Sequence, residues 1–217
     1  AQPSGQKDDH VRAVFLFTPR VEEDFAIFRL ERGLRKALQK NYPLLLGANA
    51  SQPQVQFDLE DAHIAATVAT SSDFDLCRVS MNGLGQFQVS VVKRLENDGF
   101  TSEWLVAVAK FFMAMVDDVC HGLVEATRPG RVSAELRDVK EKWLKVVASH
   151  QESDPSIPTD GKAKTSEVQG VDFVYTPVLD KHEPLIADIV SELAIYFRHE
   201  TGNGVGINRE ALIQALK

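Results

Sequence analysis

The clearest hydrophobic pattern in the chain is the run QFQVSVVKRL at 86–95, in which polar and apolar residues alternate. A period of two places successive side chains on opposite faces of a strand, so this run predicts a half-buried strand. Shorter runs rich in β-branched and aromatic residues predict further strands at 11–19, 54–59, 63–70 and 171–178.

A second pattern, with apolar residues three or four positions apart, predicts a helix at 22–41. Its acidic residues come early, and Arg35, Lys36 and Lys40 come late, an order that complements the helix dipole. Similar spacing predicts helices at 133–150 with Ser133 as N-cap, at 184–200, and at 209–217 with Asn208 as N-cap.

The stretch 101–127 fits two interpretations. Apolar residues recur along it at helical spacing, which favours one helix capped by Thr101 or Ser102. Alternatively, the apolar run at 105–113 forms a strand, and only the residues that follow it are helical. Local periodicity favours the single helix.

The segment NYPLLLGANA at 41–50 joins the first predicted helix to the strand at 54–59. We interpret it as a helix end, at which Pro43 stops the helix and three consecutive leucines begin a buried strand.

Two segments are predicted to lie outside the core. Residues 1–10 are polar and are expected to be flexible, and 151–170 is rich in Pro, Ser, Gly and charge, as in an exposed loop. Strands cluster early and helices late, with one strand inserted between helices. This order predicts a single α+β domain at 11–217, with a mixed, mainly antiparallel sheet packed against several helices in a two-layer sandwich.

Composition narrows the class of partner. The chain has 217 residues, of which 44% are hydrophobic and 25% charged, as in a globular protein that can bury a core. Its formal net charge of -7 argues against nucleic acid as a partner, because phosphate binding relies on clustered Lys and Arg.

The apolar run at 104–116 contains Lys110 and is too short for a membrane span, so we expect a soluble, acidic protein. Two cysteines far apart suit a reducing compartment, so we expect a cytoplasmic location.

Candidate chemistry is sparse. Six histidines are scattered without zinc-site spacing, so no metal site is predicted. Asp117 and His121 are four residues apart and would share a helical face, where the carboxylate could orient the imidazole, so both are candidate catalytic residues. Cys120 would face about 100° away from His121, which argues against a cysteine nucleophile. The simpler interpretation is a surface Asp–His pair beside a buried cysteine.

Two stretches carry a family resemblance. LERGLRKALQKNYPLLLGAN at 30–49 is similar to a family stretch in which a helix ends in Tyr-Pro and leucines before a strand. The run at 86–95 is similar to the strand that precedes the family's catalytic segment, HHxxxDG. From Phe15 onward, the order of features resembles the N-terminal half of the CoA-dependent acyltransferases of the BAHD and chloramphenicol-acetyltransferase-like superfamily.

The resemblance implies an acyltransferase-like fold, CoA or acyl-CoA as cofactor, and the second histidine of HHxxxDG as general base. The best counterpart of that segment is FMAMVDD at 112–118, in which Asp117 matches the aspartate. Met113 stands at the position of the base, and Asp118 at that of the glycine. The family's second half has no counterpart in these residues, so the resemblance also implies a companion chain or a missing second half.

We therefore expect an acyltransferase-like domain or fragment with impaired or absent catalysis, in which His121 is the nearest substitute base. The alternative is a non-catalytic α+β binding module for a partner protein or an apolar small ligand. A strand at 105–113 leading to Asp117 would support the resemblance, and a helix there would largely remove it.

Overall fold

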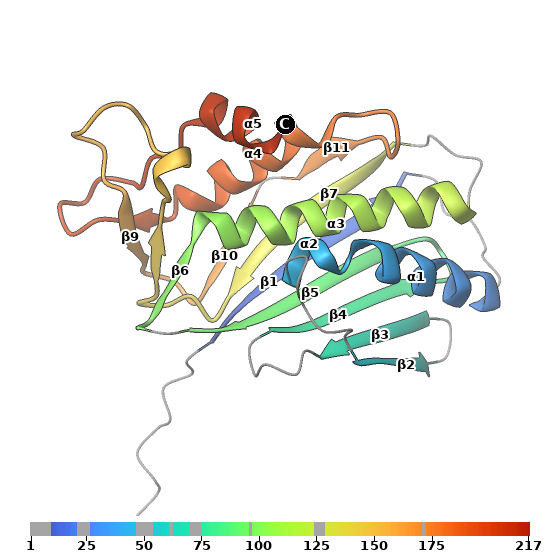
Figure 1. Cartoon of the computed structure of the whole chain (residues 1–217). Coiled ribbons are helices and arrows are strands. Elements are labelled where there is room, and N and C mark those ends of the chain that lie inside the picture. The colour runs from blue at the N-terminus through green and yellow to red at the C-terminus, as the bar shows by residue number, and fades with distance from the viewer. Residues whose placement is uncertain are drawn as a thin grey trace, which may run out of the picture.

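A large sheet and a layer of helices make up most of the computed structural model (Figure 1). The structure describes residues 10–20, 27–46, 54–60, 63–69, 75–95, 97–123, 129–170 and 172–217. The expected flexible N-terminus lies almost entirely outside these residues. The chain has an α+β fold, as predicted from the sequence.

The large sheet has eight strands, all paired antiparallel, in the order β10-β7-β1-β5-β4-β3-β2, with β11 also paired to β7. Its strands are β1 (His10–Pro19), β2 (Gln54–Glu60), β3 (His63–Ala69), β4 (Asp75–Asn82), β5 (Phe87–Arg94), β7 (Gly130–Arg137), β10 (Glu167–Gln169) and β11 (Phe173–Tyr175). The strands predicted near 11–19, 54–59, 63–70 and 86–95 are confirmed.

A second sheet of four strands has the order β12-β9-β8-β6. It is formed by β6 (Gly99–Thr101), β8 (Trp143–Lys145), β9 (Asp160–Ala163) and β12 (Phe197–Arg198). The β6–β8 pair is parallel, so the strand pairing of the whole fold is mixed and mainly antiparallel.

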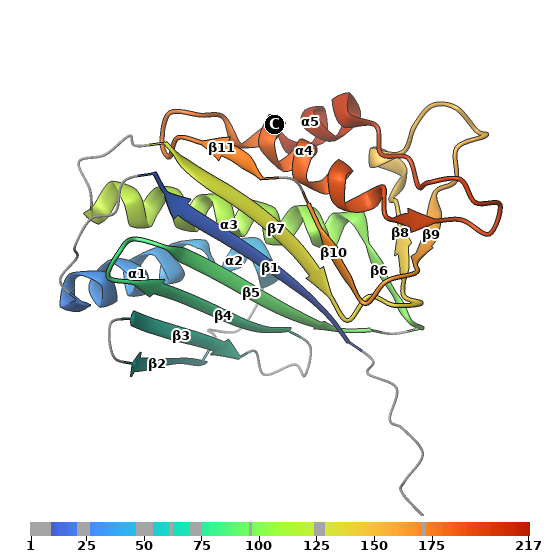
Figure 2. The ribbon, with the colours of Figure 1, turned by 180° about the vertical axis from the view of Figure 1, so that it is seen from behind.

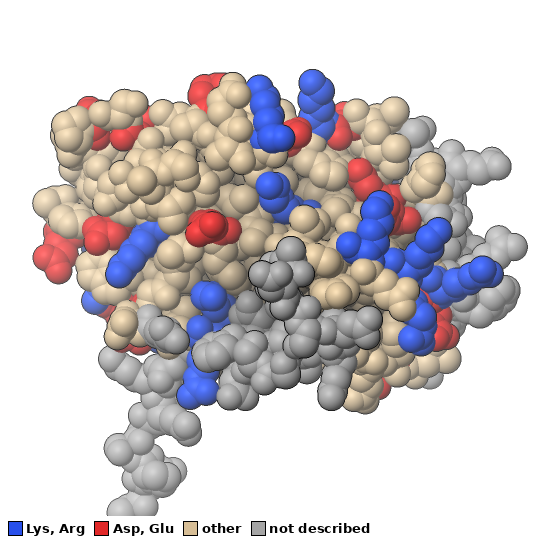
Figure 3. All heavy atoms as spheres, viewed as in Figure 1, with Lys and Arg blue, Asp and Glu red and all other residues tan. Residues whose placement is uncertain are grey.

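The helices are α1 (Ile27–Asn41), α2 (Pro43–Leu46), α3 (Ser102–Leu123), α4 (His182–Ala194) and α5 (Arg209–Leu216), with a 3-10 turn at Ala148–His150. Helices α1 and α3 lie across one face of the large sheet, and in the described residues no helix covers the other face (Figures 1 and 2). On the helix-bearing side, Lys and Arg are interspersed with Asp and Glu (Figure 3).

Helix α3 supplies the centre of the core. The ring of Phe112 lies 5.3 Å from that of Phe15 in β1 and 6.0 Å from that of Phe87 in β5. This burial explains the apolar composition of α3. The structure has one helix from Ser102 to Leu123, so the single-helix interpretation of 101–127 is confirmed over the described residues. None of the described helices combines the length and apolar character needed to cross a membrane.

The predicted helix at 133–150 is wrong. Its first residues belong to β7, which pairs with β1 on one side and with β10 and β11 on the other. The strand ends at a turn in which Asp138 has a φ of 61°. Val132, Ala134 and Leu136 are buried at a strand period of two. Pairing between distant segments therefore overrides the helix-like spacing of the sequence.

Other boundaries also differ from the predictions. The segment 151–170 is not one loop, because it contains β9 and β10, although 153–156 is exposed. Pro43 begins the short helix α2, and Leu44 is 43% exposed, so no buried strand starts there. The helix predicted at 184–200 ends at Ala194, and β12 follows it.

Candidate functional site

The most connected polar cluster joins the end of α3 to the segment that leads into α4. It consists of Asp117 in α3, Tyr175 at the end of β11 and His182 at the first position of α4. Antiparallel pairing holds β11 against β7, and α4 packs on α3. These contacts bring three residues together that are far apart in the sequence.

Asp117 accepts hydrogen bonds on both carboxylate oxygens. Its Oδ1 accepts from the Tyr175 hydroxyl at 2.5 Å and from the backbone N–H of Val178 at 2.9 Å. Its Oδ2 lies 2.8 Å from Nε2 of His182. The same Nε2 lies 2.9 Å from the Tyr175 hydroxyl, so the three side chains form a closed triangle.

The carboxyl group of Asp117 is held in its charged form. Burial acts to raise its pKa, but the hydrogen bonds from His182, Tyr175 and Val178 together outweigh burial and lower the pKa. A carboxylate that stays charged while half-buried can orient a neighbouring imidazole at neutral pH.

Tyr175 remains a neutral phenol. Burial and its hydrogen bond to the negative Asp117 both raise its pKa. Its side chain is fully buried, so it serves to position the carboxylate and is not a surface acid.

His182 is the most exposed member of the triangle, with 30% of its side chain accessible to solvent, against 23% for Asp117. In the neutral ring, an Nε2–H that donates to Asp117 leaves the lone pair on Nδ1. None of the described residues forms a hydrogen bond with Nδ1. The arrangement is that of an oriented general base, because one nitrogen is fixed by a carboxylate and the other is free to take a proton.

The loop between β11 and α4 is shaped around Asp117. Val178 has a φ of 68°, which is unusual for a β-branched residue. The carboxylate of Asp180 accepts the backbone N–H of Thr176 at 2.6 Å and closes the turn. Val178 and Leu179 are 49% and 65% exposed, so apolar side chains reach the surface three and four positions before His182.

The predicted pairing of Asp117 with His121 is corrected by this geometry. His121 is exposed on α3, whereas both oxygens of Asp117 are engaged by β11 and the residues that follow it. The expectation that Asp117 orients an imidazole is met by a different histidine, one that lies in α4. No local spacing in the sequence points to Tyr175 or His182, because their relation to Asp117 depends on the packing of α4 on α3.

Cys120 lies close enough to this cluster for the charge of Asp117 to affect it. Burial and that charge raise the pKa of the Cys120 thiol to about 12. It is therefore protonated at neutral pH. Among the described residues, no group of three or more His, Cys, Asp and Glu side chains could hold a metal ion.

Comparison of the chain with protein-family models, with curated proteins and with solved structures finds no match.

Proposed function

We propose that the chain is an acyltransferase-like enzyme in which His182, oriented by Asp117, is the general base. The observation that carries this proposal is the 2.8 Å contact between Asp117 Oδ2 and His182 Nε2 in an imidazole that is partly exposed. Nδ1 would take the proton from an acceptor hydroxyl or amine as the acceptor attacks the carbonyl carbon of an acyl-CoA. The carbon–sulfur bond then breaks, and the CoA thiolate takes the proton back from the imidazolium.

The structure does not favour the alignment of the family motif HHxxxDG with residues 112–118. Residues 112–118 lie inside helix α3, so the alignment of Met113 with the catalytic histidine has no strand before it, and that part of the resemblance is lost. If HHxxxDG is instead placed at the end of β5, it falls on 93–99, and Asp98 and Gly99 match its last two residues.

This second placement supports a base from elsewhere in the chain. Arg94 stands at the position of the second histidine, and a guanidinium cannot accept a proton at neutral pH. Asp98 accepts a hydrogen bond from Lys142 at 3.2 Å and ties the turn after β5 to the start of β8. Because 105–113 is helical, the resemblance is largely removed. The proposal therefore takes only the reaction class from the family and rests on the Asp117–His182 geometry, which assigns the base role to His182.

Acyl transfer from acetyl-CoA to a panel of hydroxyl and amine acceptors tests the proposal. We expect His182→Gln to lower the rate by about 10²–10⁴-fold, the usual contribution of a general base, and Asp117→Asn to lower it as well. His121→Gln is the matched control and should leave the rate unchanged. Full activity of His182→Gln, or a wild-type chain that neither transfers acetyl groups nor is thermally stabilised by CoA, would overturn the proposal.

A non-catalytic binding module is the second candidate, and the open face of the large sheet favours it (Figure 2). In this proposal a partner protein or a companion chain covers that face. Light scattering after size-exclusion chromatography, combined with urea unfolding of the isolated chain, tests it. A monomer that unfolds in one sharp transition would argue against an obligate companion.

A further inference from the structure

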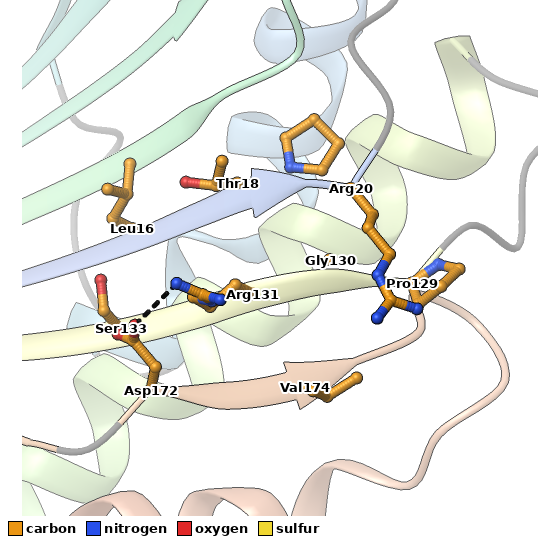
Figure 4. Close-up of a pocket in the computed structure, with 10 residues that line it drawn as sticks. Leu16, Thr18, Arg20, Pro129, Gly130, Arg131, Ser133, Asp172 and Val174 are labelled. Carbon is orange, nitrogen blue, oxygen red and sulfur yellow. Dashed lines mark ion pairs between the residues drawn. The ribbon is translucent and has the colours of Figure 1, made fainter.

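A pocket of about 420 Å³ lies on the open face of the large sheet, where β1, β7 and β11 meet (Figure 4). Its floor is set by strand register, since Thr18 pairs with Arg131 and Leu16 with Ser133. Val174 of β11 pairs with the other side of Arg131. Side chains from three strands therefore converge on one small volume.

The pocket combines positive charge with hydroxyl groups and an apolar wall. Arg20 reaches it from the end of β1, and Arg131 lies beside it on β7 (Figure 4). The hydroxyl-bearing residues Thr18 and Ser133 also line the pocket, and Leu16 and the 75%-exposed Val174 supply apolar surface.

One of the two arginines is already partly neutralised. Nη1 of Arg131 lies 3.3 Å from Oδ2 of Asp172, and this ion pair is solvent-exposed. Arg20 has no acidic partner among the described residues. Among the described lining residues, two guanidinium groups and one carboxylate give a net charge of one positive unit, within a chain whose formal net charge is -7.

We propose that this pocket binds a small carboxylate that carries a short apolar chain. Guanidinium groups hold carboxylates through paired hydrogen bonds, and the hydroxyls add further donors. The single surplus charge matches a monocarboxylate better than a doubly charged phosphate. A volume of about 420 Å³ lies within the range of small-molecule sites, and Leu16 and Val174 receive the apolar chain.

This site is separate from the proposed catalytic one. Val174 and Tyr175 are neighbours in β11, but Val174 faces the pocket while Tyr175 is buried on the other side of the strand, against Asp117. Carboxylate binding is therefore independent of whether His182 catalyses acyl transfer, and each proposal can fail without the other.

Titration of the full chain with hexanoate, followed by amide chemical shifts, tests the pocket. We expect saturable shifts in β1, β7 and β11, and no such shifts with hexylamine. Arg20→Gln and Arg131→Gln should each weaken binding by about tenfold or more. Asp172→Asn should tighten binding several-fold, because it frees Arg131 from its ion pair.

Arg94→Gln is the matched control, since Arg94 lies on the same sheet face outside the pocket. It should leave the affinity unchanged. Absence of saturable binding to the wild-type chain, equal binding of hexylamine, weaker binding by Asp172→Asn, or an equal loss in Arg94→Gln would overturn the proposal. Asp172→Asn should raise the affinity and Arg131→Gln should lower it, whereas a damaged fold would lower the affinity in both variants. Thermal melts of each variant also detect a damaged fold.

Discussion

The backbone N–H of Val178 donates a 2.9 Å hydrogen bond to Oδ1 of Asp117 while Val178 adopts a φ of 68°. For a β-branched residue this conformation costs about 1–3 kcal/mol. The residue that helps to hold the carboxylate is therefore strained, and the hydrogen bonds to Asp117 offset the strain. Backbone strain of this kind is often found at functional sites.

Replacement of Val178 by glycine should stabilise the protein. Glycine adopts positive φ without strain and keeps the N–H donor, and only a half-exposed side chain is lost. We expect a gain of roughly 1 kcal/mol in the free energy of unfolding, measured with urea. Val174→Gly, at an exposed strand position without positive φ, is the control and should destabilise the protein. A loss of stability in Val178→Gly would show that the strain is not relieved.

Cys120 should react slowly with iodoacetamide in the folded protein. With a pKa raised to about 12, its thiolate fraction at pH 8 is about one in ten thousand, against roughly one in four for a free thiol. Peptide mapping by mass spectrometry would follow alkylation of Cys120 in native buffer and in urea. Asp117→Asn should speed the native reaction, because the nearby negative charge is removed. A native rate equal to that in urea would contradict the buried thiol.

Stability should fall below neutral pH because of the buried pair Ser102 and His150. Ser102 Oγ lies 2.9 Å from Nδ1 of His150, which is only 5% exposed. Burial lowers the pKa of His150, although the charge of Glu103 acts to raise it. Below about pH 6.5 the unfolded chain therefore binds a proton that the folded chain does not, and the contribution of His150 is lost as the pH falls through its folded pKa.

The measurement for this pair is the free energy of unfolding between pH 7.5 and 5. His150→Gln should have a shallower slope than the wild type, although it is less stable at pH 7.5. His121→Gln, at an exposed position on α3, is the control and should keep the wild-type slope. If the free energy of unfolding of His150→Gln fell with pH as steeply as that of the wild type, a group other than His150 would be responsible for the pH dependence.

Gly130 should tolerate no side chain. A Cβ at this position would lie 2.3 Å from a ring carbon of Phe17 and 2.8 Å from the carbonyl oxygen of Thr18. We expect Gly130→Ala to lower the free energy of unfolding by about 3 kcal/mol, because the first residue of β7 would be forced away from β1. Gly204→Ala is the control, with no contact closer than 3.8 Å, and should change stability by less than about 0.5 kcal/mol. Equal melting temperatures for the two variants would refute this packing.

The sequence predicts the fold where local pattern and burial agree. The alternation at 86–95 and the apolar spacing of α3 match the faces that these elements bury. The failure at 133–150 has a physical cause. The spacing of Leu136 and Val139 fits a helix, whereas Ala134 and Leu136 fit a strand, and pairing with β1 decides in favour of the strand. Strand β4 was missed although Cys77, Val79 and Met81 are buried at a period of two, so its local signal was present.

The site was predictable only in part. Asp117 was among the predicted candidates, and in the structure it contacts an imidazole. Helical spacing offered His121 as that partner, because sequence distance reports only neighbours on the same helix. His182 comes from α4 and meets Asp117 through the packing of two helices, which no local pattern encodes.

Strand β11 has three residues and pairs with β7 through all of them. Its middle residue, Val174, lines the pocket, and the next residue, Tyr175, donates a hydrogen bond from its hydroxyl group to Asp117. The two residues lie on opposite faces of the same strand, so any shift of β11 would move the wall of the pocket and the Tyr175 hydroxyl together.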